Sequence, residues 1–268
     1  MDLTTIQGQP ASRLGLAGQK RMEPGCVDLA WQAGINYFFS YGLGKGPLVE
    51  ELRSHLQVHR DHVMVATGTE SRSLSETERH FDQARQKLAV DSLDVFFLEY
   101  VSPTDDWHEL RALLDRLYDW KAAGQIRYVG ISTHNRPIAL RIIQEGLCDV
   151  LMHRYNMAHR GAEAAVLPAA EAAGMPVITF TSTRWGTLLK GHPSWPHSPP
   201  SAADCYRFCL SQPAVRLALT SPQTHEQLRA NLAALTTPVM TQEEQTYWQA
   251  YGDLIYGQGN DAYETSWP

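Results

Sequence analysis

Short apolar runs alternate with longer stretches of helical periodicity eight times along the chain. The apolar runs have the length of buried strands, and the stretches after them place apolar residues on one helical face. The expected strands are residues 13–17, 35–39, 63–67, 95–99, 128–132, 150–153, 177–180 and 216–219. The expected helices are residues 23–33, 47–58, 75–88, 107–123, 137–145, 162–173, 202–211 and 224–235. Eight strand–helix pairs in 268 residues predict an α/β fold, a single-domain (β/α)8 TIM barrel spanning residues 1–268.

The composition is that of a globular protein with an apolar core. Apolar residues make up 43% of the chain and charged residues 19%, and the formal net charge is −6 with no basic tract, so we expect no nucleic-acid partner. No apolar run approaches the ~18 residues of a membrane span, and no signal peptide opens the chain, so we expect no membrane association. Four scattered cysteines do not form a disulfide framework, which predicts a reducing, cytoplasmic location.

Two segments lie outside the strand–helix pattern. Residues 191–200 are rich in proline and follow the seventh expected strand, at the active-site end of a barrel, where they form either a surface connection or a lid. Residues 247–268 form an aromatic-rich C-terminal tail, with Tyr247, Trp248, Tyr251, Tyr256, Tyr263 and Trp267. Because such a tail is rarely left in water, we expect it to pack on the barrel mouth or on a partner subunit.

Glu99 ends the apolar strand expected at residues 95–99. Such a run predicts a strand buried on both faces, as in a parallel sheet. A buried carboxyl group is costly unless it has partners or a function, and barrels place catalytic groups at the carboxyl ends of their strands. Burial is expected to raise the pKa of Glu99, which makes it a candidate general acid or base.

Several stretches occur in an order that is typical of one enzyme family. They are Gly34-Ile35-Asn36-Tyr37-Phe38, Tyr41-Gly42, Val65-Ala66-Thr67, Leu93-Asp94-Val95, residues 124–132, Tyr155-Asn156, Gly186-Thr187-Leu188-Leu189 and residues 226–232. Through them nearly the whole chain resembles the aldo-keto reductase family. The resemblance implies a barrel that binds NADPH extended across its mouth and reduces carbonyl compounds.

The family's catalysis, as the resemblance implies it, uses a tyrosine as proton donor with Asp, Lys and His around it. Tyr41 matches the tyrosine, but Phe39, Gly68 and Glu99 stand where the family has Asp, Lys and His. A free tyrosine has a pKa near ~10, and the family lowers that pKa with an ammonium group held by a carboxylate. Phe39 and Gly68 remove both groups, so Tyr41 and Glu99 become the candidate catalytic pair. Family members that reduce enones also carry Glu in place of the His.

The positions that the family uses for its cofactor are only partly kept. By resemblance, Ser132 matches the serine that binds the nicotinamide amide, Phe180 the aromatic residue on which nicotinamide stacks, and Asn231 the asparagine that contacts adenine. Thr133 stands where the family has Asn. The candidate cofactor-binding residues are therefore Ser132, Thr133, Phe180 and Asn231.

Other cofactor positions have lost their polar or charged groups. Met152 stands where the family has a Gln that binds nicotinamide, and Ser221 and Gln223 stand where it has the Gly and Arg near the 2′-phosphate. NAD(P)H is therefore expected to bind weakly if at all, and the sequence names no other cofactor.

Further polar residues follow strand ends and are expected to ring the barrel mouth. Strand alternation turns Arg154 into the barrel and His153 toward the helices. An arginine at the mouth is suited to bind a carboxylate or phosphate group. The candidate substrate-binding residues are His134, Arg154, Arg184 and Trp185, with Glu70, Arg72 and Asn135 also following strand ends. Glu99 and His134 could begin a metal site, but strand alternation turns His153 away from it, so no metal is expected.

Three functions remain open from the sequence. The favoured one is an enzyme that acts on a small polar metabolite by acid–base chemistry with Glu99 and Tyr41. The second is an NAD(P)H-dependent reductase of carbonyls or enones, and the third is an inactive binding or regulatory barrel. The sequence leaves the substrate and the oligomeric state open.

Overall fold

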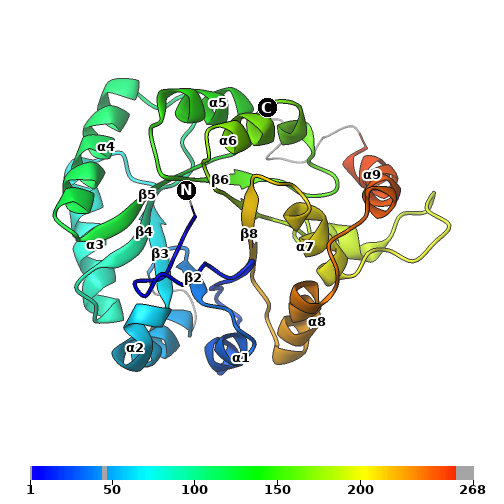
Figure 1. Cartoon of the computed structure of the whole chain (residues 1–268), viewed down its shortest axis with the longest axis horizontal. Helices are drawn as coiled ribbons and strands as arrows, with labels where there is room; N and C mark the ends of the chain where they lie inside the picture. The colour runs from blue at the N-terminus through cyan, green and yellow to red at the C-terminus, as the bar shows by residue number, and fades with distance from the viewer. Residues whose placement is uncertain (1, 44–46, 258–268) are drawn as a thin grey trace.

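The computed structural model describes residues 2–43 and 47–257. Within them, eight parallel strands close into a barrel in the order β1 to β8 (Figure 1), which confirms the predicted (β/α)8 TIM barrel. The strands are β1 (Leu14–Ala17), β2 (Tyr37–Ser40), β3 (Met64–Thr69), β4 (Leu93–Leu98), β5 (Ile126–Thr133), β6 (Val150–Arg154), β7 (Val177–Phe180) and β8 (Val215–Thr220). Each lies within three residues of its predicted bounds at either end, and Glu99 is the first residue after β4 rather than its last.

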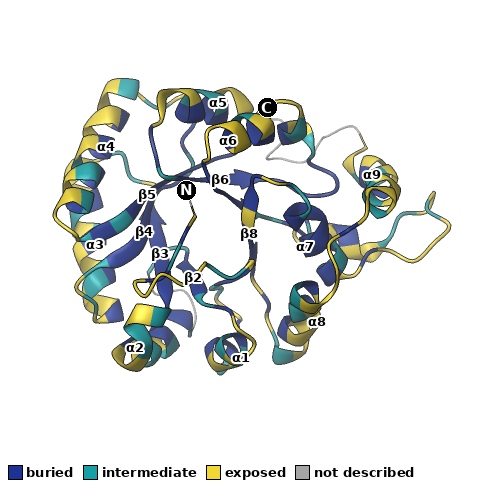
Figure 2. Cartoon of the chain, in the orientation of Figure 1, coloured by how far each residue is buried: buried dark blue, intermediate teal, exposed yellow. Residues whose placement is uncertain are grey.

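The helices surround the barrel and turn their apolar faces toward it, as Figure 2 shows. They are α1 (Cys26–Gln32), α2 (Leu48–His59), α3 (Leu74–Leu88), α4 (Trp107–Ala122), α5 (Arg136–Glu145), α6 (Val166–Ala172), α7 (Ala202–Leu210), α8 (His225–Thr236) and α9 (Gln242–Tyr256), with short 3-10 turns at Arg60–His62, Gly161–Ala164 and Thr187–Lys190. No helix in the described part of the chain is long and apolar enough to cross a membrane.

Strand alternation divides the core into two layers. The side chains inside the barrel form one apolar cluster that includes Phe39, Val95, Phe97 and Met152, while the outward-facing residues pack under the helices. Gly130 lies opposite Phe97 in the β4–β5 register, and a Cβ atom at Gly130 would lie 2.4 Å from the Phe97 ring. This glycine lets the ring fill the barrel. Glu99 continues the inward series of Val95 and Phe97.

The N-terminal segment closes the end of the barrel opposite the mouth. It crosses the middle of the ring of strands in Figure 1, and Leu3 packs into the interior cluster. Arg127 donates to the Thr4 carbonyl oxygen at 2.5 Å and also pairs with the fully buried Asp94 at 2.9 Å. The strand–helix pattern gave no indication of this closure.

Helix α9 contains residues 247–256 of the aromatic tail, and residues 258–268 lie outside the described residues. The helix packs on the loops that follow β6 and β7. Gly252 lies so close to the first loop that an added Cβ atom would be 1.9 Å from the Met157 carbonyl oxygen. Tyr251 is fully buried and donates to the Leu188 carbonyl oxygen at 2.7 Å. Trp195, from the proline-rich loop, packs against Tyr251 with ring centroids 5.3 Å apart, so this loop is fastened to α9.

Candidate active site

Glu99 is 3% exposed and lies where β4 reaches the barrel mouth. Its backbone N–H donates to Thr69 at 2.9 Å, and its carbonyl oxygen accepts from Arg72 at 2.9 Å. A Cβ atom on Gly68 would lie 2.7 Å from the Glu99 side-chain oxygen Oε1 and 2.5 Å from the Phe97 carbonyl oxygen. The Glu99 carboxyl group therefore lies directly against the position where the family places a lysine, with no room for a side chain at residue 68.

Tyr41 packs at the edge of the interior cluster, and its hydroxyl donates a hydrogen bond to the carboxylate of Glu70. Partial burial, the hydrogen bond to Glu70 and the neighbouring Tyr100 raise the pKa of Tyr41 well above its ordinary value. A proton donor of the family's kind needs a lowered pKa. In this site the tyrosine is therefore a weaker acid than a free tyrosine.

Aromatic rings form a row across the mouth from Tyr41 to Phe180. Tyr100 meets Tyr41 edge-on at a centroid distance of 5.9 Å and stacks on His134 at 5.5 Å. His134 in turn meets Phe180 edge-on at 4.9 Å. The sequence gave no prediction for Tyr100, which has a φ of 54° and whose backbone N–H donates to Ser132 Oγ at 2.8 Å. A left-handed conformation at a tyrosine has no sequence signal comparable to glycine.

His134 and Arg154 come together at the mouth as predicted, from the ends of β5 and β6. His134 is 7% exposed, and burial together with the nearby charges of Arg154 and His153 lowers its pKa to about 3. At neutral pH His134 is therefore an uncharged ring beside a buried arginine. His153 faces the other side of β6, as expected, and its Nδ1 hydrogen-bonds the Thr133 carbonyl oxygen at 2.7 Å.

The residues expected to bind nicotinamide do not fit that role well. The Ser132 hydroxyl accepts the Tyr100 backbone N–H. The Thr133 hydroxyl donates to the Val101 carbonyl oxygen at 2.7 Å and accepts from the Asn135 N–H at 3.0 Å, on a side chain with no exposed surface. Met152 offers no amide group. Phe180 keeps a ring at the mouth, but His134 packs against it.

The loop between β8 and α8 lies where the family binds the 2′-phosphate of its cofactor. In this protein, the start of α8 is hydrogen-bonded to the carboxylate of Glu23. Glu23 Oε2 accepts from the His225 backbone N–H at 2.7 Å, at the start of α8. The Glu23 N–H donates to the Gln223 carbonyl oxygen at 2.8 Å. A phosphate here would meet this negative charge. Asn231, matched to the adenine contact, instead donates to Thr220 Oγ1 at 2.9 Å.

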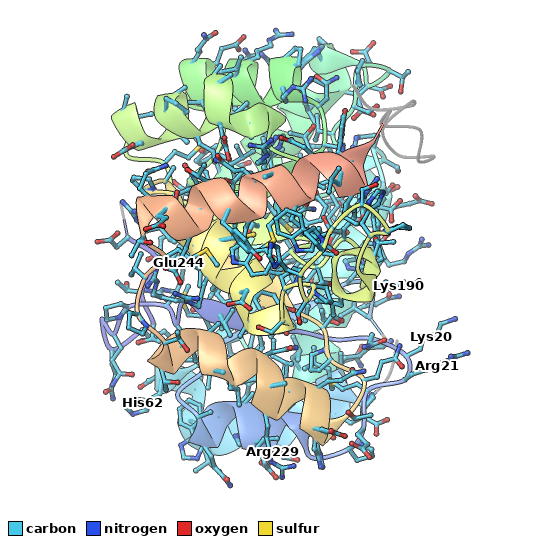
Figure 3. All side chains as sticks on the ribbon, turned by 90° about the vertical axis from the view of Figure 1, so that its right-hand side faces the viewer. Lys20, Arg21, His62, Lys190, Arg229 and Glu244 are labelled. Atoms are coloured by element: carbon cyan, nitrogen blue, oxygen red, sulfur yellow. The ribbon has the colours of Figure 1, made fainter. Side chains whose placement is uncertain are left out.

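Arg184 and Trp185, both candidate substrate-binding residues, differ in exposure. Arg184 is 8% exposed and donates to the Ile255 carbonyl oxygen in the last turn of α9. Trp185 is 55% exposed. The last turn of α9 lies at the end of the molecule that also carries the exposed cations Lys20, Arg21 and Lys190. Figure 3 shows these three residues on the side opposite His62 and Glu244.

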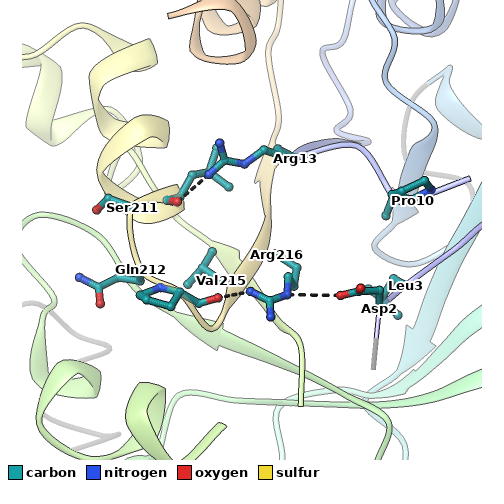
Figure 4. Close-up of a pocket in the computed structure, with 11 residues that line it drawn as sticks. Asp2, Leu3, Pro10, Arg13, Ser211, Gln212, Val215 and Arg216 are labelled. Carbon is teal, nitrogen blue, oxygen red and sulfur yellow. Dashed lines mark hydrogen bonds and ion pairs between the residues drawn. The ribbon is translucent and has the colours of Figure 1, made fainter. Parts of the chain in front are cut away.

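Other parts of the described structure offer fewer groups that could bind a metal ion or react with a substrate. No group of three or more His, Cys, Asp or Glu side chains within residues 2–43 and 47–257 is placed to hold a metal ion. A cavity of about 410 Å³ lies at the closed end of the barrel, and the residues around it include Arg13 and Arg216. Figure 4 shows these arginines bonded to the Leu210 and Pro213 carbonyl oxygens, with Asp2 paired to Arg216. The barrel mouth therefore remains the best candidate.

The model of the aldo/keto reductase family matches residues 25–202. This range is more than half of the 268 residues, and it contains Tyr41, Glu99, His134 and Arg154. The chain therefore belongs to the aldo/keto reductase family, which confirms the resemblance found in its sequence. No curated protein matches the chain.

Solved structures of aldo-keto reductases match almost the whole barrel. The holo form of an enzyme from Bacillus halodurans is 20% identical, with a TM-score of 0.77 over 97% of this chain and 98% of that one. An enzyme from Klebsiella pneumoniae in complex with NADPH is 18% identical, with a TM-score of 0.74 over 94% and 96%. A third, from Pseudomonas aeruginosa, is 21% identical, with a TM-score of 0.69 over 88% and 94%. At these identities the likeness shows the fold alone.

Proposed function

We propose that this protein is an acid–base enzyme that acts on a small polar metabolite through Glu99, without the tyrosine-centred hydride chemistry of its family. The observation that best supports this proposal is the position of the Glu99 carboxyl group, which is buried at the barrel mouth against Gly68. A buried carboxyl group at the mouth of a barrel is suited to general acid–base catalysis. The hydrogen bond from Tyr41 to Glu70 supports the loss of the family's proton donor.

The neighbours of Glu99 have roles that suit a proton transfer next to a carbonyl group. Glu99 would take a proton from the carbon beside the carbonyl, and the electron pair would move onto the carbonyl oxygen. Arg154 would stabilise the resulting negative charge, since its positive charge already acts on the adjacent His134. Where the attacked carbon carries a hydroxyl group, transfer of the hydroxyl proton to the former carbonyl oxygen and return of the abstracted proton to the former carbonyl carbon would complete an isomerisation. Where a β-hydroxyl group is present, the enolate would expel it as Glu99 returns the abstracted proton to the leaving oxygen, and release of water would complete a dehydration.

Deuterium incorporation tests this proposal without knowledge of the full reaction. The protein is incubated in D2O with small 2-oxo acids, hydroxy ketones, ketoses and aldoses, and the acidic C–H signal is followed by proton NMR. We expect at least one compound to lose this signal faster than in a protein-free control. No exchange in any of these compounds would count against a proton-abstracting enzyme.

Binding of NADPH is expected to be weak. Loss of a charge-assisted contact to the 2′-phosphate costs ~1.5–3 kcal/mol, or about one to two powers of ten in affinity, and Glu23 adds repulsion at the start of α8. Quenching of tryptophan fluorescence measures the Kd. The double variant Glu23→Gln with Gln223→Arg should bind more tightly than the natural protein. A sub-micromolar Kd for the natural protein would contradict this prediction and favour the reductase hypothesis.

Ordinary aldehydes are expected not to be reduced with NADPH at a rate above background. Restoring the family's residues with Phe39→Asp, Gly68→Lys and Glu99→His should not rescue the activity, because any side chain at residue 68 meets the Phe97 carbonyl oxygen at about 2.5 Å. NADPH oxidation at 340 nm with a panel of aldehydes measures this. Robust turnover by the natural protein would show that Tyr41 still acts as the family's acid.

A further inference from the structure

We infer that Arg72 is a positioning residue for Glu99, because its guanidinium group holds the backbone from which the Glu99 carboxyl group enters the barrel mouth. The inference rests on the proposed acid–base function and names a second residue on which that function depends. Arg72 lies in the loop between β3 and α3, and Glu99 is the first residue after β4. Strands β3 and β4 are neighbours in the barrel, so the two loops leave it side by side.

The backbone is strained immediately after Glu99. Tyr100 has a φ of 54°, in the left-handed region that is costly for a residue other than glycine, so neighbouring contacts must hold it there. The Tyr100 backbone N–H donates to Ser132 Oγ at 2.8 Å, and the Val101 N–H donates to the Ser132 carbonyl oxygen at 2.8 Å. Ser132 on β5 therefore holds one side of the strained segment.

Arg72 holds the other side of this segment. Its Nη2 donates to the Glu99 carbonyl oxygen at 2.9 Å, and its Nη1 donates to the Glu70 carbonyl oxygen at 3.1 Å. The Glu99 N–H also donates to the Thr69 carbonyl oxygen at 2.9 Å, so both backbone polar groups of Glu99 are bonded. Because side-chain direction is coupled to the backbone, these bonds also fix the point from which the carboxyl group projects.

A carboxylate keeps the guanidinium group in place. Asp105 Oδ2 accepts from Arg72 Nη2 at 2.9 Å and from the Ser102 N–H at 2.8 Å. Asp105 is itself held by a turn, since its N–H donates to the Ser102 carbonyl oxygen at 3.2 Å. Pro103 stands at the second position of that turn, where proline is favoured. The side chains of Arg72 and Asp105 are only 18% and 15% exposed, so salt weakens this ion pair less than a surface pair.

These contacts require an arginine rather than any cation. A guanidinium group is planar and donates from several nitrogen atoms in fixed directions, and here it reaches two carbonyl oxygens and a carboxylate at once. The ammonium group of lysine is a single centre on a flexible chain. A catalytic acid or base depends on its geometry, and a displacement of ~1 Å lowers a rate by up to ~10²-fold. Arg72 bonds the backbone of Glu99, so it acts on the reaction through Glu99.

The first test uses the protein without a substrate and follows backbone amide hydrogen exchange by mass spectrometry, in peptides that cover residues 98–105. Arg72→Met keeps an unbranched side chain and removes all of its donors. Exchange in this segment should become faster by ~10-fold or more in Arg72→Met and by less in Arg72→Lys. Arg79→Met, which removes an exposed arginine of α3, is the matched control and should leave the exchange unchanged. Natural protection in Arg72→Met would overturn the inference.

The second test measures deuterium incorporation into the compound that exchanges most rapidly with the natural protein. Arg72→Met should lower the maximal rate by ~10-fold or more, with little change in the concentration that half-saturates the protein. Arg72→Lys should retain an intermediate rate. The double variant Arg72→Met with Glu99→Gln should be no slower than Glu99→Gln alone, because Arg72 acts only through Glu99. A natural maximal rate in Arg72→Met, or a further loss in the double variant, would overturn the inference.

Two further measurements keep these outcomes distinct. Thermal unfolding shows whether Arg72→Met folds; if it does not, Asp105→Asn is the milder variant, because it weakens the ion pair and keeps an oxygen for the Ser102 N–H. Asp105→Asn should change both readouts in the same direction to a smaller extent, and natural values in both would overturn the inference. Absence of deuterium incorporation with the natural protein would instead contradict the proposed function, and the amide exchange would still decide whether Arg72 holds the backbone at Glu99.

Discussion

Glu99→Gln is expected to lower the rate of deuterium incorporation by ~10²-fold or more, the usual contribution of a general acid or base. Glutamine has the same size as glutamate, so its side chain still fits against Gly68. The hydrogen bond from the backbone N–H of residue 99 to the Thr69 carbonyl oxygen is also kept. The substitution removes the group that takes and returns the proton. The effect should appear in the rate of exchange, with little change in the concentration of compound that half-saturates the protein.

Two comparisons separate this loss from a loss of folding. Thermal unfolding of Glu99→Gln should show a cooperative transition near or above that of the natural protein, because removing a buried ionisable group is often neutral or stabilising. Glu171→Gln, which removes an exposed carboxylate on α6, is the matched control and should leave the exchange unchanged. If the barrel only binds its ligand, Glu99→Gln will leave binding intact and the natural protein will show no exchange to lose.

The fold was accessible from the sequence because its signals are local and repeated. Each strand is a short apolar run, each helix has its own apolar face, and eight such pairs leave little choice of architecture. The same alternation placed Glu99 and Arg154 inside the barrel and His153 outside, since side-chain direction follows from strand parity alone. Those are the residues for which prediction and structure agree most closely.

The remainder of the site depends on contacts between residues far apart in the chain. The positive φ of Tyr100, the bond from Tyr41 to Glu70 and the placement of Glu23 at the start of α8 have no periodic signal. The contact of Arg184 with α9 joins segments separated by 71 residues. Apolar periodicity reports burial, but it does not report which polar groups meet at a loop. For the aromatic-rich tail, packing at the mouth was predicted correctly for residues 247–256, which lie in α9 on the loops after β6 and β7; residues 258–268 lie outside the described residues.

The stability of the protein is expected to fall steeply as the pH decreases from about 6.5 to 4, because of His134 and His153. Burial is the largest cause in both cases, and it lowers the pKa of His134 to about 3 and that of His153 to about 4. In the unfolded chain both rings bind a proton near pH ~6.5. The stability that these neutral rings provide is therefore complete above pH ~6.5 and is lost as the pH falls toward the folded values. At pH 4 the loss is about 3 kcal/mol for each ring.

Urea unfolding between pH 7 and 4 measures this loss as the slope of the unfolding free energy against pH. His134→Phe keeps a ring to stack on Tyr100, and His153→Gln keeps a donor for the Thr133 carbonyl oxygen. Each variant should reduce the slope by about one proton, which is ~1.4 kcal/mol per pH unit. The exposed His108 on α4 is the matched control, and His108→Gln should leave the slope unchanged. Equal slopes in the natural protein and both variants would contradict the lowered pKa values, because they would mean that these rings bind protons at the same pH in the folded and the unfolded protein.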